Sequence, residues 1–184
     1  MLFRSVFMLG AVGRDGFADE LIRNLRQSDV NTEFVLCKEG PSGIAFITVS
    51  QDGHNTIVLS DGANGKLAKE DVEPFLAQAE QGDLLLVQNE IPWETVAYSI
   101  RKARKSKMNV IYNFAPVISK DEEVAEILKL PDTLIVNEIE MMSLTGKKAE
   151  TPEQAEAAAI SLLREGVKEV VLTMGDQGSF YMNR

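Results

Sequence analysis

Five expected strands of this chain are each followed by carboxylate, amide or glycine residues that could do chemistry. In an open parallel sheet, ligands lie outside the carboxyl ends of the strands. The pattern therefore predicts one rim lined by these groups, with glycines that let the backbone approach a phosphate or a ring. The five segments are residues 10–16, 88–90, 113–116, 137–140 and 173–178.

Each segment also has a purely structural interpretation. Glu90 suits a ligand contact and equally a place near a helix N-terminus, where the helix dipole favours a carboxylate. Asn137 and Glu140 have the spacing of a capping box. Residues 173–178 fit either a turn into a final strand or a backbone that binds phosphate. Residues 10–16 have the pattern Gly-x-x-Gly-x-x-Gly instead of the dinucleotide fingerprint, which disfavours NAD binding.

The composition excludes several classes of protein. One cysteine (Cys37) and one histidine (His54) provide neither an internal disulfide nor a zinc site, and they favour a cytoplasmic location. No apolar run approaches the roughly 18 residues of a membrane span. The net charge of −9 disfavours nucleic-acid binding, and the basic run 101–107 has no interleaved aromatic residue, so it is interpreted as a solvated helix face. His54 is expected in a solvated turn.

The apolar pattern predicts which elements position the rim. The later strands are apolar throughout and alternate with helices, which is typical of a parallel sheet covered on both faces. Asp52-Gly53 between two β-branched runs predicts a hairpin. We therefore expect an α/β core over residues 6–32 and 61–184, with a small antiparallel flap inserted at 33–60. The predicted strands are 6–12, 33–37, 43–49, 56–59, 83–88, 109–112, 133–136 and 170–172, and the predicted helices are 17–26, 69–79, 93–105, 121–128, 138–144 and 152–164.

Taken in order, these segments resemble the ribokinase, or PfkB, family of sugar kinases. The resemblance runs from about Phe7 to Tyr181 and implies a three-layer αβα, Rossmann-like, mostly parallel sheet with a small antiparallel β lid. The matching segments are residues 10–17 (Gly-x-Val-Gly-x-Asp-x-Phe), 42–47 and 62–64 (the lid strands and the loop after them), 87–92 (containing Gln-x-Glu-x-Pro), 113–116 (similar to Asn-Pro-Ala-Pro), and 137–140 with 144–146 (Asn-Glu-x-Glu and Leu-Thr-Gly).

The resemblance also implies roles for particular residues. Glu90 and Ser42 would bind the sugar, and the flap would close over it and form the contact of a homodimer. Asn137 and Glu140 would organise Mg²⁺ through water near the phosphates of ATP. The segment that would contact the nucleotide consists of Thr173, Met174, Gly175, Asp176, Gln177 and Gly178.

Two motifs of the family have no counterpart in these 184 residues. One is the sugar-binding Gly-Gly-Lys-x-x-Asn, and the other is Asp-Thr-x-Gly-Ala-Gly-Asp, which supplies the anion hole and the catalytic aspartate. We therefore assign no catalytic base, and Asp176 is not promoted to that role. The chain is interpreted as an inactive internal fragment of a longer kinase, with residues 2–5 as a foreign lead-in. A K⁺ site is expected in the intact family member only.

The working hypothesis is a ribokinase-type enzyme that transfers the γ-phosphoryl group of ATP to the 5-hydroxyl of ribose. The segments 88–92 and 113–116 favour ribokinase over fructokinase, adenosine kinase and pseudouridine kinase. Two alternatives stay open: a non-catalytic protein of the same fold that binds nucleotide or sugar, and another kinase of the family.

Overall fold

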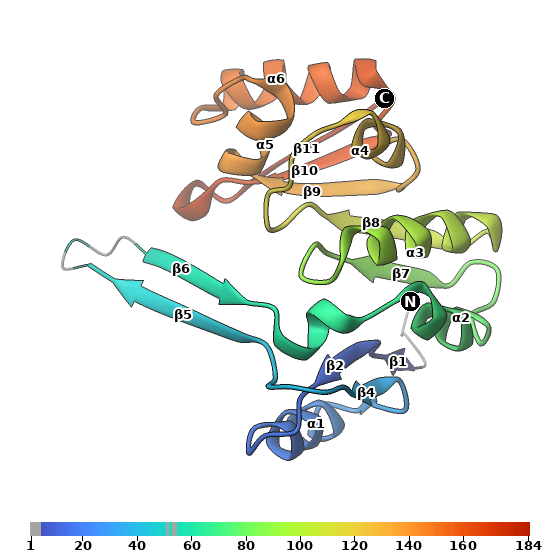
Figure 1. Ribbon diagram of the computed structural model, residues 1–184. Helices are drawn as coiled ribbons and strands as arrows, with labels where there is room; N and C mark the ends of the chain where they lie inside the picture. The colour runs from blue at the N-terminus through green and yellow to red at the C-terminus, as the bar shows by residue number, and fades with distance from the viewer. Residues whose placement is uncertain (1–4, 51, 53–54) are drawn as a thin grey trace. The chain divides into compact units, whose positions relative to one another are not determined.

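The computed structural model describes residues 5–50, 52 and 55–184, which divide into two compact units (Figure 1). Unit 1 comprises the described part of residues 1–75 together with Glu90–Pro92, and unit 2 comprises Leu76–Asn89 and Trp93–Arg184. The prediction that His54 lies in a solvated turn concerns a residue outside the described ranges. No helix of the described residues is long and apolar enough to cross a bilayer.

Unit 2 is built on one five-stranded sheet with the order β11-β10-β9-β8-β7 (Figure 1). Neighbouring strands from β7 to β10 pair in parallel, and only β11 runs antiparallel to β10. This order confirms the predicted α/β class with a mostly parallel sheet. The strands are β7 (Leu84–Val87), β8 (Asn109–Asn113), β9 (Thr133–Asn137), β10 (Glu169–Thr173) and β11 (Ser179–Asn183).

Four helices alternate with these strands and begin close to their predicted positions. They are α3 (Trp93–Lys105), α4 (Glu122–Ile127), α5 (Glu138–Thr145) and α6 (Pro152–Glu165). Helix α6 shows why the sequence fixes helix ends. Thr151 caps its N-terminus by accepting from Gln154 N, Pro152 occupies the first turn, and Gly166 ends it in the left-handed conformation at φ 119°.

Alternate side chains of the sheet are buried in unit 2. Val110, Tyr112, Val136 and Leu172 are fully inaccessible. On edge strand β7, Leu85 and Val87 are buried, but Leu84 and Leu86, which point to the other face of the sheet, are 41% and 66% exposed. The expectation of a sheet covered on both faces is therefore wrong for β7, since an apolar strand sequence does not reveal which of its faces another element covers.

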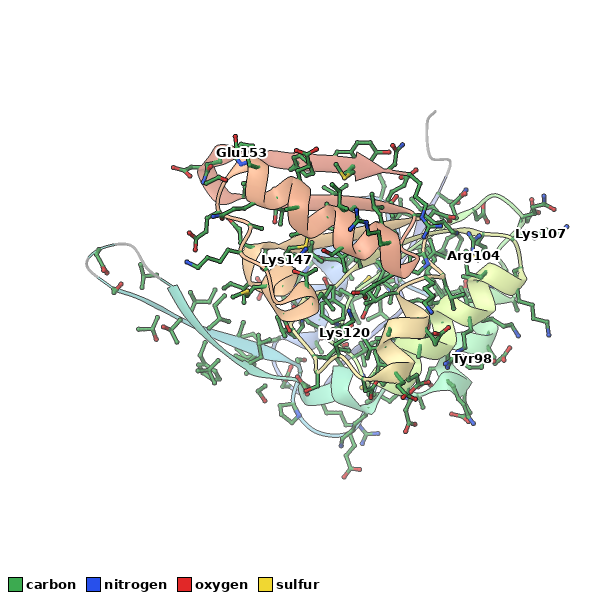
Figure 2. The ribbon with its side chains drawn as sticks, turned by 90° about the horizontal axis from the view of Figure 1, so that it is seen from above. Tyr98, Arg104, Lys107, Lys120, Lys147 and Glu153 are labelled. Carbon is green, nitrogen blue, oxygen red and sulfur yellow. The ribbon has the colours of Figure 1, made fainter. Side chains whose placement is uncertain are left out.

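Ion pairs and hydrogen bonds join the elements of unit 2 at its surface. Arg104, labelled in Figure 2 near the end of α3, donates to Asp132 at 2.6 Å, and Lys168 donates to the other carboxylate oxygen at 2.9 Å. Lys120 and Lys147, also labelled in Figure 2, link α5 and α6. Lys120 Nζ donates to Leu144 O and Glu165 Oε2, and Lys147 Nζ donates to Ser161 Oγ.

Unit 1 contains two short parallel strand pairs and one long antiparallel hairpin (Figure 1). Strand β1 (Val6–Phe7) pairs with β3 (Val30–Asn31), and β2 (Gly10–Val12) pairs with β4 (Val35–Cys37). The antiparallel part of the predicted flap therefore begins at β5 and not at residue 33, because β4 pairs with β2 in parallel. The hairpin consists of β5 (Ile44–Val49) and β6 (Asn55–Ser60).

The remaining elements of unit 1 surround these strands. Helix α1 (Ala18–Gln27) follows β2, and a 3-10 turn, η1 (Gly62–Lys66), follows the hairpin. Ala11, Ala63 and Leu67 form a small buried cluster that joins β2 to η1. Helix α2 (Lys69–Leu76) ends three residues earlier than predicted.

The Asp132 cluster generates a prediction about stability. Burial acts to raise the pKa of Asp132, but hydrogen bonds from Lys168 and Val110 N and the charges of Lys168 and Arg104 outweigh it, so the pKa is lowered. We expect Asp132→Asn to reduce the free energy of unfolding at pH 7 by about 1–2 kcal/mol, a value discounted for partial exposure. Urea denaturation followed by the fluorescence of Trp93, the single tryptophan, measures it.

The stability contribution of Asp132 should depend on pH, and a control variant tests its assignment. Because the folded-state pKa of Asp132 is lowered, its contribution is present above the ordinary value of 3.8 and is lost as the pH falls through the folded-state pKa. The wild type and Asp132→Asn should therefore converge in acid. Glu70→Gln, which removes only an exposed carboxylate 3.9 Å from Lys69, should change little. Equal effects of the two variants at pH 7 would contradict the assignment.

Candidate functional site

A polar cavity lies beside the base of the hairpin in unit 1. Its volume is about 200 Å³, below the roughly 300–1,000 Å³ of sites for drug-sized ligands, so it suits a small molecule. Four side chains with hydrogen-bonding groups line it, namely Ser60, Asp61, Asn64 and Glu90. The rest of the lining is Gly43, Ile44, Ala45 and Leu59.

Glu90 is placed in this cavity and outside any helix. Its side chain is exposed, and α3 begins only at Trp93. Glu90 therefore lies outside the first turn of α3, where the helix dipole acts most strongly, and contact of Glu90 with a ligand stays a prediction.

Asn64 presents a defined group to the cavity. Its side-chain oxygen accepts a hydrogen bond from Ala11 N at 2.7 Å, which fixes the orientation of the amide. The Nδ2 atom is then the donor that Asn64 offers toward a ligand, beside the carboxylates of Asp61 and Glu90. The sequence motif at residues 62–64 contained Asn64 without indicating this role, and no sequence signal marked Asp61.

Ser42, predicted to bind substrate, is buried at the root of β5 with 3% exposure. Its hydroxyl donates to Asp15 Oδ1 at 3.1 Å and accepts from Gly13 N at 2.9 Å. The hydroxyl is therefore used within the protein, and Ser42 is not among the residues that line the cavity. Direct contact of Ser42 with a substrate stays a prediction.

Asn137 and Glu140 form the capping box that their spacing allowed. Asn137 Oδ1 accepts from Glu140 N at 2.8 Å, Glu140 Oε2 accepts from Asn137 N at 2.7 Å, and Asn137 Nδ2 donates to Glu140 Oε1 at 2.9 Å. Glu140 is only 4% exposed, and burial raises its pKa in spite of the hydrogen bonds from Asn137. A largely buried carboxylate at the carboxyl end of β9 is thus held in one orientation.

Residues 173–178 form the turn from β10 into β11. Thr173 lies opposite Asn137 in the parallel register, which brings the ends of β9 and β10 together. Met174 N donates to Gly178 O at 2.9 Å, and Gly175 and Gly178 have positive φ angles of 53° and 89° that closing this turn requires. The turn into a final strand is confirmed, and nucleotide contact by this turn stays a prediction.

The ends of β7 and β8 also come together. The Tyr112 hydroxyl donates to Asn89 Oδ1 at 2.5 Å, and Asn89 donates through Nδ2 to Pro116 O at 2.9 Å. Burial raises the pKa of Tyr112, so the hydroxyl stays a donor at physiological pH. The strand-end segments of unit 2 thus lie along one edge of its sheet, as the sequence predicted. No group of three or more His, Cys, Asp or Glu side chains able to hold a metal occurs in the described part of the chain.

Unit 2 has a mostly parallel sheet with polar strand ends, and unit 1 has a hairpin beside a polar cavity. These features define the chain as an α/β protein of the class in which ligand sites are expected at strand ends and in polar cavities. Residues 1–184 match the model of the pfkB family of carbohydrate kinases. The chain belongs to this family.

Known relatives support this assignment. The chain is 35% identical over 182 residues to a deoxyribokinase of Salmonella typhimurium and 36% identical over 181 residues to a ribokinase of Schizosaccharomyces pombe. These alignments cover 97% and 96% of this chain, but 58% and 56% of the relatives. The chain therefore spans a little over half the length of the curated relatives it matches.

Solved structures agree on the fold. A ribokinase from Giardia lamblia matches with a TM-score of 0.83 at 26% identity, covering 96% of this chain and 55% of that one. An Arabidopsis thaliana ribokinase complexed with ribose and ATP matches with a TM-score of 0.81 at 26% identity, covering 98% of this chain and 58% of that one. The predicted ribokinase-like fold is confirmed.

The environment of Glu140 generates a second prediction. Because its folded-state pKa is raised above the ordinary value of 4.5, the folded state binds more protons than the unfolded state just above that pH, so stability falls as the pH rises through this window. Glu140→Gln retains an oxygen that can accept from Asn137 N and removes the titrating group. We expect the variant to lack this part of the pH dependence.

Urea unfolding of the wild type and the variant between pH 4 and 7, followed by Trp93 fluorescence, measures the difference. Glu138→Gln, two residues earlier in the first turn of α5, is the matched control and should follow the wild type. A Glu140→Gln profile parallel to that of the wild type would show that burial does not perturb this carboxyl group.

Proposed function

We propose that this chain forms part of a sugar kinase that transfers the γ-phosphoryl group of ATP to the 5-hydroxyl of ribose. The observation that carries the proposal is the cavity with Glu90, Asn64 and Asp61 at the base of a hairpin, in a chain of the pfkB family. The similarity to an Arabidopsis ribokinase complexed with ribose and ATP supports the choice of substrates.

The cavity of unit 1 has groups suited to a sugar. The Glu90 carboxylate would accept hydrogen bonds from sugar hydroxyls, and Asn64 Nδ2 would donate to a sugar oxygen. The flap over residues 33–60, whose antiparallel part is β5 and β6, would close over the bound sugar. Closure excludes the water that would otherwise accept the phosphoryl group.

The strand ends of unit 2 have groups suited to a nucleotide and its metal. The turn from Thr173 to Gly178 would contact the nucleotide, and Asn137 and Glu140 would organise Mg²⁺ through water. The residues fit this role, because the Glu140 carboxylate is largely buried, has a raised pKa and would be stabilised by a nearby cation. Since both its oxygens already accept from Asn137, a bridging water fits better than direct coordination.

Magnesium would supply charge neutralisation on the transferred phosphoryl group. The side chains of this chain would position the two substrates, and no residue described here is assigned as the base. A K⁺ site is proposed for the intact family member only. Cytoplasmic location, where ATP is available, fits this function.

The sugar assignment generates a third prediction. We expect the 184-residue chain to bind D-ribose in isothermal titration calorimetry, and Glu90→Gln to weaken binding by about ten- to a hundredfold, the value of one or two hydrogen bonds to a charged group. Glu94→Gln, an exposed position in the first turn of α3, is the matched control. Unchanged affinity in Glu90→Gln would remove Glu90 from the sugar site.

Competition and turnover separate the alternatives. Because one relative is a deoxyribokinase, 2-deoxyribose is titrated beside ribose, and tighter binding of 2-deoxyribose would reassign the substrate. With Mg-ATP and ribose we expect binding without phosphorylation, because no catalytic base is assigned within these residues. Turnover by this chain would contradict that expectation and make Asp176 the next residue to mutate.

The hairpin is also proposed to form a homodimer contact. Apolar side chains are exposed on both of its faces, since Phe46 and Val58 pair on one face and Ile47 and Ile57 on the other, each more than half exposed. Contiguous exposed apolar surface of this kind marks an interaction site. A second copy of the hairpin would cover one face.

This contact generates a fourth prediction. We expect light scattering after size-exclusion chromatography to give a dimer for the wild type. One of two double variants, Phe46→Asp with Val58→Asp or Ile47→Asp with Ile57→Asp, should give a monomer, because a carboxylate cannot be buried unpaired in an apolar contact. A monomeric wild type, or a dimer that survives both double variants, would contradict the proposal.

A further inference from the structure

The hairpin of unit 1 is attached through a very close backbone contact. Two backbone hydrogen bonds hold residues 40–42, which lead into β5. Arg14 N donates to Gly40 O at 2.9 Å, and Ala63 N donates to Pro41 O at 2.8 Å. A Cβ atom at Gly13 would lie 2.2–2.3 Å from Gly40, Pro41 and Ser42 atoms, and one at Gly62 would lie 2.6 Å from Pro41 and Ser42 atoms. Only glycine fits at positions 13 and 62.

The carboxylate of Asp15 binds Ser42, the residue at the centre of this contact. Asp15 Oδ2 accepts from Ser42 N at 2.5 Å, and Asp15 Oδ1 accepts from Ser42 Oγ at 3.1 Å. Ser42 Oγ in turn accepts from Gly13 N at 2.9 Å. The backbone N–H of Ser42 is also the main reason that the pKa of Asp15 is lowered, so the carboxylate is charged at physiological pH.

Ser42 directly precedes, in the sequence, the first residues that line the cavity. The next residue, Gly43, lines the cavity, and β5 begins at Ile44. A Cβ atom at Gly43 would lie 3.0 Å from Asp61 O, so the two ends of the hairpin run side by side here. Any movement of Ser42 therefore changes the place of the hairpin relative to Asp61 and Asn64, which also line the cavity.

We propose that Asp15 is a positioning residue that clamps Ser42 and thereby fixes the hairpin β5–β6 over the sugar cavity. It acts through Ser42 and does not touch the sugar. The hairpin's role over a sugar rests on the proposed function, whereas the clamp itself rests only on the contacts within unit 1. Asp15 also accepts from Phe17 N at 3.0 Å and Ala18 N at 3.2 Å at the start of α1, but helix capping alone would leave its two bonds to Ser42 unexplained.

Hydrogen exchange of the 184-residue chain, followed by mass spectrometry, tests the clamp without any ligand. Asp15→Asn keeps one oxygen for the start of α1 but puts an amide group where Oδ2 accepted from Ser42 N. Ser42→Ala removes only the hydroxyl, and Ser42→Thr retains it. We expect exchange in β5 and β6 to be roughly tenfold faster in Asp15→Asn and Ser42→Ala, and near the wild-type rate in Ser42→Thr.

Matched controls come from unit 2. Asp121→Asn alters another aspartate at a helix start, which accepts from Val124 N at 2.8 Å, and Ser99→Ala alters another buried serine, which donates to Thr95 O at 2.7 Å. Neither should change exchange in the hairpin. Unchanged hairpin exchange in Asp15→Asn and Ser42→Ala would overturn the proposal. An increase spread equally over α1 and β1–β4 would also overturn it, because it would show a general loss of structure.

A second readout separates the clamp from the sugar assignment. Titration with D-ribose should show about tenfold weaker binding in Asp15→Asn and Ser42→Ala, with wild-type affinity in Ser42→Thr. Wild-type affinity in all three variants would show that the clamp does not position the cavity wall. Absence of ribose binding by the wild type would contradict the proposed function, and the exchange data would still decide the clamp.

Discussion

The close backbone contact among Gly13, residues 40–42 and Gly62 is the constraint on which unit 1 depends. Any larger residue at either glycine would force the chain segments apart. Because both ends of the hairpin pass this point, the contact determines where β5 and β6 leave the unit. The cavity beside the hairpin therefore owes its shape to backbone packing, with Asp15 and Ser42 adding directional hydrogen bonds.

Unit 2 holds polar groups at the edge of a largely apolar sheet. Residues such as Val110 and Leu172 lie on the buried side of the strands. Asn137 and Thr173 lie opposite each other at the carboxyl ends of β9 and β10. The capping box keeps Glu140 buried and hydrogen-bonded at the same time. A carboxylate in this condition is held in a fixed orientation, which suits a role near a cation and phosphates.

Phosphoryl transfer depends mainly on positioning and on neutralising charge. The two units of this pfkB-family chain divide those tasks in the proposed function, with a cavity for the sugar in unit 1 and strand ends for the nucleotide in unit 2. The local structure of the unit 1 site rests on hydrogen bonds between residues far apart in sequence, such as Asn64 with Ala11 and Ser42 with Asp15, whereas the capping box of unit 2 joins residues only three apart.

The sequence by itself determined the α/β class, the position of α3 at residues 93–105, the ends of α6 and the family, because periodicity, caps and motifs are local signals. It also located Glu90, Asn137 and Glu140 at strand ends. Only the tertiary structure decided that β4 pairs with β2, that Leu86 is exposed, and that Ser42 is bound by Asp15. These features depend on which distant segments meet, and neither residue types nor their spacing along the chain specify that.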